Sequence, residues 1–228
     1  EHFITWALSH DVDGAKLVGR MAVESDKGGD DSINQAATLW IFHSLSVAIC
    51  NNKVDPQSEA ILRAAIEPRL QKAIAPNASK TDILTGTALE LLCRWRHPDA
   101  VSAAKATALN LEGKVNGSLN IFGRESVSQT RGLAAQWWIS SHDPKLFTDL
   151  PELLKPTGGL LANDRRKVFD AMAALDNANI GEVTLTVYPE LEDDLKPAAV
   201  ELLTSRVAWS NQLLDAIAAG KVSKDAVN

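Results

Sequence analysis

A unit of two apolar helical stretches joined by a short polar break recurs through the second half of the chain. The four clearest copies begin at Ala88, Leu133, Val168 and Ala199, and the first of them reads ALELLCRWRHPDAVSAAKATAL. One helix pair of this size cannot bury its apolar face alone, so neighbouring pairs stack and share a core. The pattern therefore predicts an all-α fold, an α-solenoid of stacked antiparallel helix pairs.

The starts of these copies lie 45, 35 and 31 residues apart, which straddles the periods of tetratricopeptide, ankyrin and HEAT or armadillo repeats. The tetratricopeptide pattern and the ankyrin TPLHxA are absent, so we expect a HEAT/armadillo-like array. It covers residues 1–228 as a single domain, with less regular repeats in 1–80 and clearer ones in 81–228. A glycine-rich loop at 110–126 interrupts the clearer part and is either a tolerated insertion or a binding loop. Since EHFITWALSH opens inside a helical pattern without an initiator Met, we expect a domain excised from a longer chain.

The first half contains one long helix and one proline-interrupted helix. An apolar stripe from residue 39 to residue 49 predicts the long helix, which ends at the asparagine pair 51–52. Asp55 and Pro56 then offer an N-cap and a first helical position. Pro68 falls inside the next apolar pattern, where it must kink or split the helix.

Two proline turns separate helices in the clearer repeats. His97 precedes Pro98 in one turn, and the other reads SHDPK with Pro144. We expect both prolines at first helical positions. His97 and His142 then occupy equivalent turn positions, which favours a structural role over metal ligation.

The charge balance argues against nucleic acid as a partner. The formal net charge is -6 and the pI about 5.4, whereas a nucleic-acid footprint needs lysines and arginines gathered on one face. No apolar run approaches the roughly 18 residues of a membrane-spanning helix, because the longest, near residues 40–50, is interrupted by His43, Ser44 and Ser46. We therefore expect no membrane span.

Motifs that carry chemistry are absent: the chain has no P-loop, dinucleotide-binding turn, GxSxG, HExxH or paired CxxC. We expect no catalytic, cofactor-binding or metal residues. The nearest approach to a metal or acid/base cluster is His10 with Asp11 and Asp13, although an HDVDG turn needs no function to explain it. The acidic run at 190–194 is interpreted as helix capping, with a calcium site as the alternative.

The six tryptophans invite an aromatic-platform interpretation, but core packing is preferred. Trp95 and Trp209 follow apolar stripes. Trp137 and Trp138 point about 100° apart on one helix, so we expect one of them to pack between repeats and the other to lie nearer the surface or under the long loop.

The two cysteines, Cys50 and Cys93, lie in apolar helical stretches. We interpret them as small buried hydrophobes. A disulfide between them stays open, because it depends on three-dimensional distance.

The C-terminal segment 202–227, LLTSRVAWSNQLLDAIAAGKVSKDAV, carries a more specific pattern. It resembles the last helical repeat of large secreted planctomycete-type proteins, in which a β-propeller dehydrogenase-like domain is followed by HEAT-like repeats and a c-type cytochrome domain. The residues that carry this resemblance are Arg206, Trp209, Leu213, Leu214, Ala216, Gly220 and Ser223.

This resemblance implies an exported, periplasmic protein whose dehydrogenase-like and haem c modules lie outside this chain. Haem attachment needs CxxCH, whereas Cys50 and Cys93 are followed by NNKV and RWRH, so no haem site is carried onto this segment. The leading hypothesis is a non-catalytic scaffold or spacer whose partners are the neighbouring domains of the same chain. The alternatives are a solenoid that binds a protein or peptide partner, and an enzyme whose site is assembled across repeats near His10, Asp11 and Asp13.

Overall fold

The regular secondary structure is helical throughout the part of the chain that the structure describes. The computed structural model describes residues 4, 7–8, 12–25, 32–75, 77–78, 83–109 and 127–227. Eleven α-helices, α2 to α12, and three short 3-10 turns, together with the helical residues 4, 7 and 8, account for the regular structure in these ranges. The predicted all-α class is therefore confirmed for the described residues. Residue contacts divide the chain into two compact units, one of residues 1–100 and 117–121 and one of residues 101–116 and 122–228.

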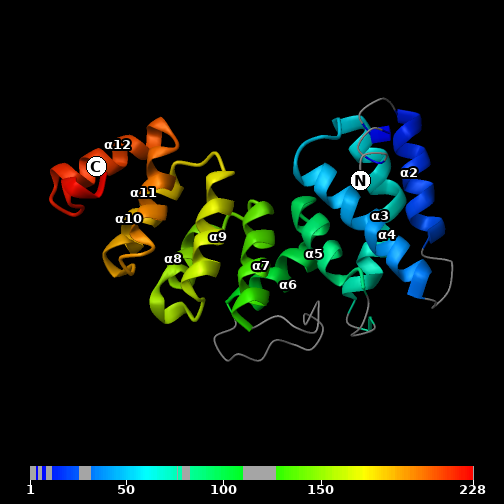
Figure 1. Ribbon diagram of the computed structural model, residues 1–228, viewed down its shortest axis with the longest axis horizontal. Coiled ribbons are helices and arrows are strands. Elements are labelled where there is room, and N and C mark those ends of the chain that lie inside the picture. The colour runs from blue at the N-terminus through cyan, green and yellow to red at the C-terminus, as the bar shows by residue number, and fades with distance from the viewer. Residues whose placement is uncertain are drawn as a thin grey trace. The chain divides into compact units, whose positions relative to one another are not determined.

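The first unit contains four described helices in mutual contact. Its helices are α2 (Val12–Ser25), α3 (Ser32–Cys50), α4 (Pro56–Ile74) and α5 (Thr85–Arg94). Both α3 and α4 pack against α2 and against α5 (Figure 1). Gly19 lets α2 approach α4 closely, because a Cβ at this position would lie 3.1 Å from the Ala65 Cβ. The apolar stripes of the four helices meet in one core.

The helix ends of the first unit follow the sequence signals. Asp55 caps α4 by accepting hydrogen bonds from the backbone N–H groups of Gln57 and Ser58, at 2.9 and 3.0 Å. Beyond the end of α3, Asn52 takes a left-handed conformation with φ 54°. Pro68 does not split α4, which runs unbroken through it to Ile74.

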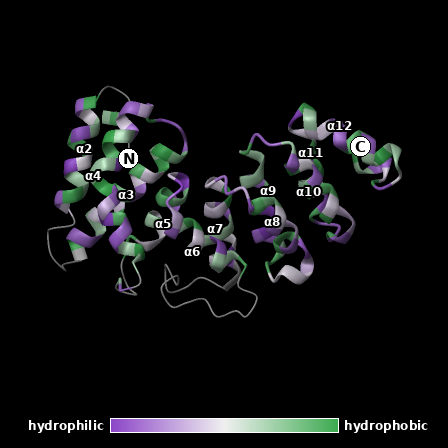
Figure 2. Ribbon diagram, turned by 180° about the vertical axis from the view of Figure 1, so that it is seen from behind, coloured by the Kyte–Doolittle hydropathy of each residue, from purple (hydrophilic) through white to green (hydrophobic). Residues whose placement is uncertain are grey.

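The second unit consists of consecutive short helices joined by turns. Its helices are α6 (Pro98–Ala108), most of which lies in this unit, then α7 (Val127–Ser140), α8 (Leu146–Leu154), α9 (Ala162–Ala173), α10 (Asn179–Val187), α11 (Lys196–Thr204) and α12 (Val207–Ala218). Helix α9 contacts both α7 and α11, and α10 contacts both α8 and α12. The helices predicted from Leu133, Val168 and Ala199 are thus present, and α11 also contacts α12. The predicted stacking of antiparallel pairs into a solenoid stays a prediction. Polar and apolar residues alternate around these helices (Figure 2).

The proline turns differ from their predicted register. Pro98 is the first residue of α6, as predicted, but Pro144 lies two residues before α8 begins. The left-handed residues of the two turns are Arg96, with φ 59°, and His142, with φ 54°. His142 therefore corresponds to Arg96 and not to His97, so the predicted equivalence of the two histidines is wrong by one residue.

Both adjacent tryptophans of α7 are buried, so of the two expected alternatives for the second ring, a position near the surface is wrong. Trp138 is fully buried and Trp137 is 8% exposed. Their neighbours Ala134, Ala135 and Ile139 are buried as well, so the second half of α7 is covered on more than one side. On a helix that is surrounded on several sides, two side chains that point about 100° apart can both be buried.

Helix α3 contains a window, Ile33–Cys50, that is long and apolar enough to cross a membrane by length and composition, with a mean hydropathy of 1.3. The expectation that no segment reaches this threshold is wrong for this window. Phe42, Leu45 and Ile49 in it are fully buried against the rest of the first unit. The core helix of a soluble protein and a signal sequence pass the same test.

Candidate functional site

The polar cluster singled out from the sequence is only partly described. His10 and Asp11 lie outside the described residues, as does the loop at 110–126. Asp13 lies in the first turn of α2, where its carboxylate forms an exposed ion pair of 2.9 Å with Lys16. Within the described ranges, no group of three or more His, Cys, Asp or Glu side chains could hold a metal ion. A site at His10, Asp11 and Asp13 stays a prediction.

The acidic run before α11 forms ion pairs and does not cap the helix. Glu192 accepts a hydrogen bond from the buried Arg165, and this bond lowers the pKa of the Glu192 carboxyl. Asp193 pairs with Lys196 at 2.8 Å. The N-cap of α11 is Leu195, which makes no side-chain capping bond. These carboxylates therefore pair with cations and supply no capping hydrogen bond, and their favourable interaction with the dipole of α11 stays a prediction.

Buried arginines are the main polar feature of the second unit. The Arg131 side chain in α7 is 3% exposed, and burial lowers its pKa. Its Nε donates to the Ala108 carbonyl at 3.0 Å, and its Nη2 donates to the Gly158 carbonyl at 2.7 Å. Ala108 is the last residue of α6, so Arg131 satisfies a carbonyl that the helix itself leaves without a partner.

Two further arginines repeat this contact. Arg165 in α9 donates to the carbonyl of Leu154, the last residue of α8, at 3.2 Å. Arg206, the N-cap residue of α12, donates to the carbonyl of Ala173, the last residue of α9, at 3.2 Å. A cation at a helix C-terminus also interacts favourably with the helix dipole. Each of these arginines therefore ties one helix to the end of an earlier one.

Three tryptophans are held by internal polar contacts. Each indole N–H donates a hydrogen bond, and each ring lies under a cation whose Cζ or Nζ is 5.1 to 5.5 Å from the ring centroid. The sets are Trp95 with Glu59 and Arg63, Trp138 with Asp143 and Lys105, and Trp209 with the Asn177 carbonyl and Arg206. These rings are buried, so the preferred core-packing interpretation is confirmed for Trp95 and Trp209.

Neither cysteine is poised as a nucleophile. Burial, reinforced by the nearby Glu90 carboxylate, raises the pKa of the Cys50 thiol to about 11. Burial also raises the pKa of the Cys93 thiol to about 12. Both are free thiols, Cys93 buried and Cys50 half-buried, and both are protonated near neutral pH. Ser46, next to Cys50, is itself buried and donates its hydroxyl to Glu90.

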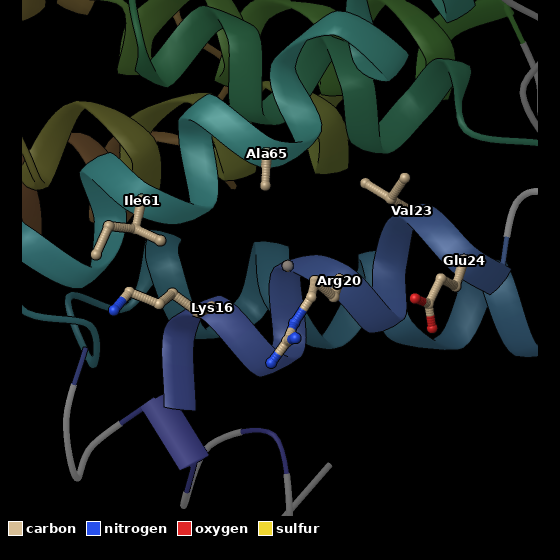
Figure 3. A pocket seen from close by; sticks show the side chains of 7 residues that line it. Lys16, Arg20, Val23, Glu24, Ile61 and Ala65 are labelled. Carbon is tan, nitrogen blue, oxygen red and sulfur yellow. The ribbon is translucent and has the colours of Figure 1, made fainter. Parts of the chain in front are cut away.

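A groove between α2 and α4 is the first candidate binding surface. It encloses about 580 Å³, and Figure 3 shows Ile61 and Ala65 reaching from α4 toward α2, with Val23 reaching back. Lys16 and Arg20 stand on its α2 rim. The groove thus joins a small apolar floor to a cationic edge.

A second groove, also of about 580 Å³, lies between α10 and α12 in the second unit. Leu185, Ala216 and Ala219 supply its apolar part, and Glu182 and Asp215 are among its charged residues. Both grooves are shallow channels between packed helices. Such surfaces suit the side chains of a protein partner better than the enclosed pocket of a small substrate.

No known protein family, curated protein or solved structure matches the chain in the comparisons. The functional reading therefore rests on the residues themselves. Sequence reasoning assigned no role to Arg131 or to Arg165. For Arg131 a signal was present, because it is the one charged residue of α7. For Arg165 there was none, because α9 also contains Asp164, Arg166, Lys167 and Asp170.

Proposed function

We propose that this chain is a non-catalytic scaffold, a HEAT-like α-solenoid that holds neighbouring domains of a multidomain protein at a fixed separation. The observation that carries this proposal is the packing of α9 on α7 and α11 and of α10 on α8 and α12. Stacked helix pairs of this kind make a stiff spacer, because each pair buries its apolar face against the next.

The use of polar groups supports the same proposal. Arg131, Arg165 and Arg206 bind helix ends, and the acidic run before α11 pairs with lysine and arginine. These side chains stabilise the stack and are not free to act on a substrate. The described polar network is that of a structural element.

The resemblance of the C-terminal segment 202–227 supports one class of parent protein. Arg206 covers the Trp209 ring, and the Trp209 indole N–H donates to the Asn177 carbonyl at 2.9 Å, so both fix α12 onto the α9–α10 turn. Leu213 and Ala216 are buried on the same helix. The residues that carry the resemblance thus have packing roles, which a spacer repeat requires. The parent is an exported protein with a dehydrogenase-like domain and a haem c domain on either side of this spacer.

The gene that encodes this chain tests the parent assignment. We expect the reading frame to continue into a segment with CxxCH on the C-terminal side and a β-propeller on the N-terminal side. A frame with neither module would overturn the haem-protein version.

The spacer role itself is tested in the full-length protein. Replacing this segment by a Gly/Ser linker of equal length lets the flanking domains sample many separations, because such a linker behaves as a flexible coil. We expect the distribution of distances between two spin labels, one in each flanking domain, to broaden several-fold. An unchanged distribution would contradict a spacer function.

A protein-binding or peptide-binding solenoid is the second candidate, favoured by the α2/α4 groove. Ile61→Glu places a charge on its apolar floor, and Ala64→Glu, at an exposed α4 position outside the groove lining, is the matched control. Quantitative co-purification should lose a specific partner with the first variant and keep it with the second. Equal recovery with both variants would count against this groove.

A further inference from the structure

Two buried arginines of the second unit, Arg131 and Arg165, share one plan of contacts. Each lies near the start of its helix, α7 for Arg131 and α9 for Arg165. Each donates to the last carbonyl of the helix before it, that of Ala108 in α6 and that of Leu154 in α8. The contact is the same although 18 residues connect α6 to α7 and seven connect α8 to α9. It therefore belongs to the packing of the helices and does not follow from the length of the connection.

The second contacts of the two arginines are equivalent as well. The Arg131 Nη2 donates to the Gly158 carbonyl, and the Arg165 Nη2 donates to the Glu192 carboxylate. In both cases the acceptor lies 27 residues after the arginine, just beyond the next helix, which is α8 for Arg131 and α10 for Arg165. Each guanidinium thus joins the end of the preceding helix to the segment beyond the following one.

The two sets of contacts meet in the connection between α8 and α9. This connection contains the 3-10 turn η2 (Pro156–Gly158). Arg165 binds the Leu154 carbonyl just before the connection, and Arg131 binds the Gly158 carbonyl four residues later. Because Arg131 belongs to α7 and Arg165 to α9, the connection is held from both sides.

The backbone of this connection leaves room for the Arg131 guanidinium. Gly159 has φ 78°, a left-handed conformation that is unfavourable for a residue with a Cβ. A Cβ on Gly159 would also lie 2.6 Å from the Arg131 Nη1. Arg131 is 3% exposed and its guanidinium already donates to two carbonyls, so it cannot easily move aside. A glycine is therefore required beside this guanidinium.

We propose that Arg131, Arg165 and Gly159 form an inter-helix lock, which makes the helices on the two sides of this connection, α6–α8 and α9–α12, open as one cooperative unit. Stacked helical repeats can open in parts, because their stability is roughly a sum of local and nearest-neighbour contributions. The lock suppresses such partial opening. It adds a conformational property that the spacer function does not include, and it holds whatever domains flank the chain.

The physical reason is the cost of a buried charge that loses its partners. If α6–α8 opened alone, Arg165 would lose the Leu154 carbonyl. If α9–α12 opened alone, the connection would be released at its α9 end, and Arg131 would lose its contact with the Gly158 carbonyl. A buried cation without its acceptors is strongly unfavourable, so either partial opening is disfavoured. Contacts of α7 with α9 and of α8 with α10 also cross this connection, and the test must separate them from the lock.

Native-state hydrogen exchange on the 228-residue chain, in increasing urea below the unfolding transition, tests the coupling. In wild type, the slowest amides of α7 and of α10 should open with the same free energy and the same dependence on urea. In Arg131→Met, the α7 amides should exchange at least tenfold faster than those of α10. Arg166→Met, at an exposed position of α9, is the matched control and should keep the two sets together. If Arg131→Met does not fold, Arg165→Met tests the lock from the other side, with the α10 amides as the faster set.

Two glycine substitutions separate the lock from ordinary backbone strain. Gly220 has φ 71°, and nothing lies within 4 Å of a Cβ built on it, so Gly220→Ala measures the left-handed strain alone. We expect it to raise the unfolding equilibrium constant about tenfold in urea denaturation, and Gly159→Ala to raise it at least about a hundredfold. In the Arg131→Met background, the effect of Gly159→Ala should fall to that of Gly220→Ala, because Nη1 is gone.

Three results would overturn the proposal. The α7 and α10 amides of wild type could open with different free energies. Arg131→Met could lower the protection of both sets equally, which would assign the coupling to the packing of α7 on α9 and of α8 on α10. Gly159→Ala could cost no more than Gly220→Ala, which would mean that the Arg131 guanidinium does not depend on this glycine.

Discussion

The two units bind their helix ends in different ways. In the first unit the side chains at the ends of α4 are short: Asp55 caps its N-terminus, and the Thr85 hydroxyl donates to the Ala73 carbonyl near its C-terminus at 3.4 Å. In the second unit, buried Arg131 and Arg165 reach the last carbonyls of α6 and α8. The N-cap residues of α9, α11 and α12 make no side-chain capping bond, and neither does Leu84, the N-cap of α5 in the first unit. The second unit therefore uses long cationic side chains at helix C-termini, whereas short polar side chains, Asp143 and Asn177, accept backbone N–H groups near the starts of α8 and α10 as Asp55 does in the first unit.

This difference has an energetic consequence. A short cap satisfies one or two backbone groups at the edge of a helix and can be replaced at modest cost by water. A buried arginine satisfies carbonyls that water does not reach, so its removal leaves them unpaired inside the protein. We therefore expect the most sensitive polar positions to lie in the second unit.

Among the substitutions that test this comparison, Arg131→Met should lower the free energy of unfolding most. It removes both donors to the Ala108 and Gly158 carbonyls while keeping an unbranched apolar side chain. We expect a loss of about 2–4 kcal/mol in the free energy of unfolding. Urea denaturation measures it, and Arg166→Met, at an exposed neighbour of Arg165, is the control with a change within about 0.5 kcal/mol. If the two variants have equal free energies of unfolding, the buried arginine contributes no more than an exposed one, and the expectation that the second unit holds the most sensitive polar positions is wrong.

Arg165→Met should cost less than Arg131→Met. It removes the bond to the Leu154 carbonyl and the pair with Glu192, but the Glu192 side chain is 43% exposed and regains water. We expect about 1–3 kcal/mol by the same measurement. The pKa of the Glu192 carboxyl should also rise in the variant, because the hydrogen bond from Arg165 lowers it. An NMR titration that finds this pKa unchanged would contradict the pair.

Asp55→Ala tests the cap of the first unit and its pH dependence. Hydrogen bonds from Ser58 lower the pKa of the Asp55 carboxyl in the folded chain. The cap therefore stabilises fully above the unfolded pKa, about 3.9, and its contribution is lost as pH falls through the lower folded value. We expect a melting point about 2–4 °C below wild type at pH 7, with the gap closing below about pH 4. A gap that stays constant down to pH 2 would mean that the carboxylate charge has no part in the cap.

Thr85→Val should have the smallest effect. It keeps the shape of the side chain and removes a hydroxyl whose bond to the Ala73 carbonyl is long. We expect a loss of about 0.5–1 kcal/mol in urea denaturation. A loss as large as that of Arg131→Met would show that the first unit depends equally on buried donors to helix C-termini.

Much of the helix organisation could be predicted from local signals. The apolar periodicity located the repeated helix pairs, and Asp55 with Pro56 marked the start of α4. These signals work because they depend on residues within one or two turns of each other. The turn register at His142 was misassigned because a His and an Arg can each adopt the left-handed conformation there, and only the observed φ angles identify which residue does.

The polar sites were harder to predict because their partners are distant in the sequence. Arg131 and Ala108 are 23 residues apart, and Arg165 and Glu192 are 27 apart. The burial of Trp137 beside Trp138 likewise depends on how many neighbours surround α7. No local pattern contains this information.

The sequence by itself determined that the described chain is helical, where most of its helices begin and end, and that α3 has no charged residue. Helix formation and capping depend on residues that are close in the sequence, so the sequence alone is enough to predict these features. The tertiary structure decided which carbonyls the arginines satisfy and which tryptophans are buried. Those outcomes depend on which helices become neighbours, because burial and hydrogen bonding between distant residues exist only once the helices have packed.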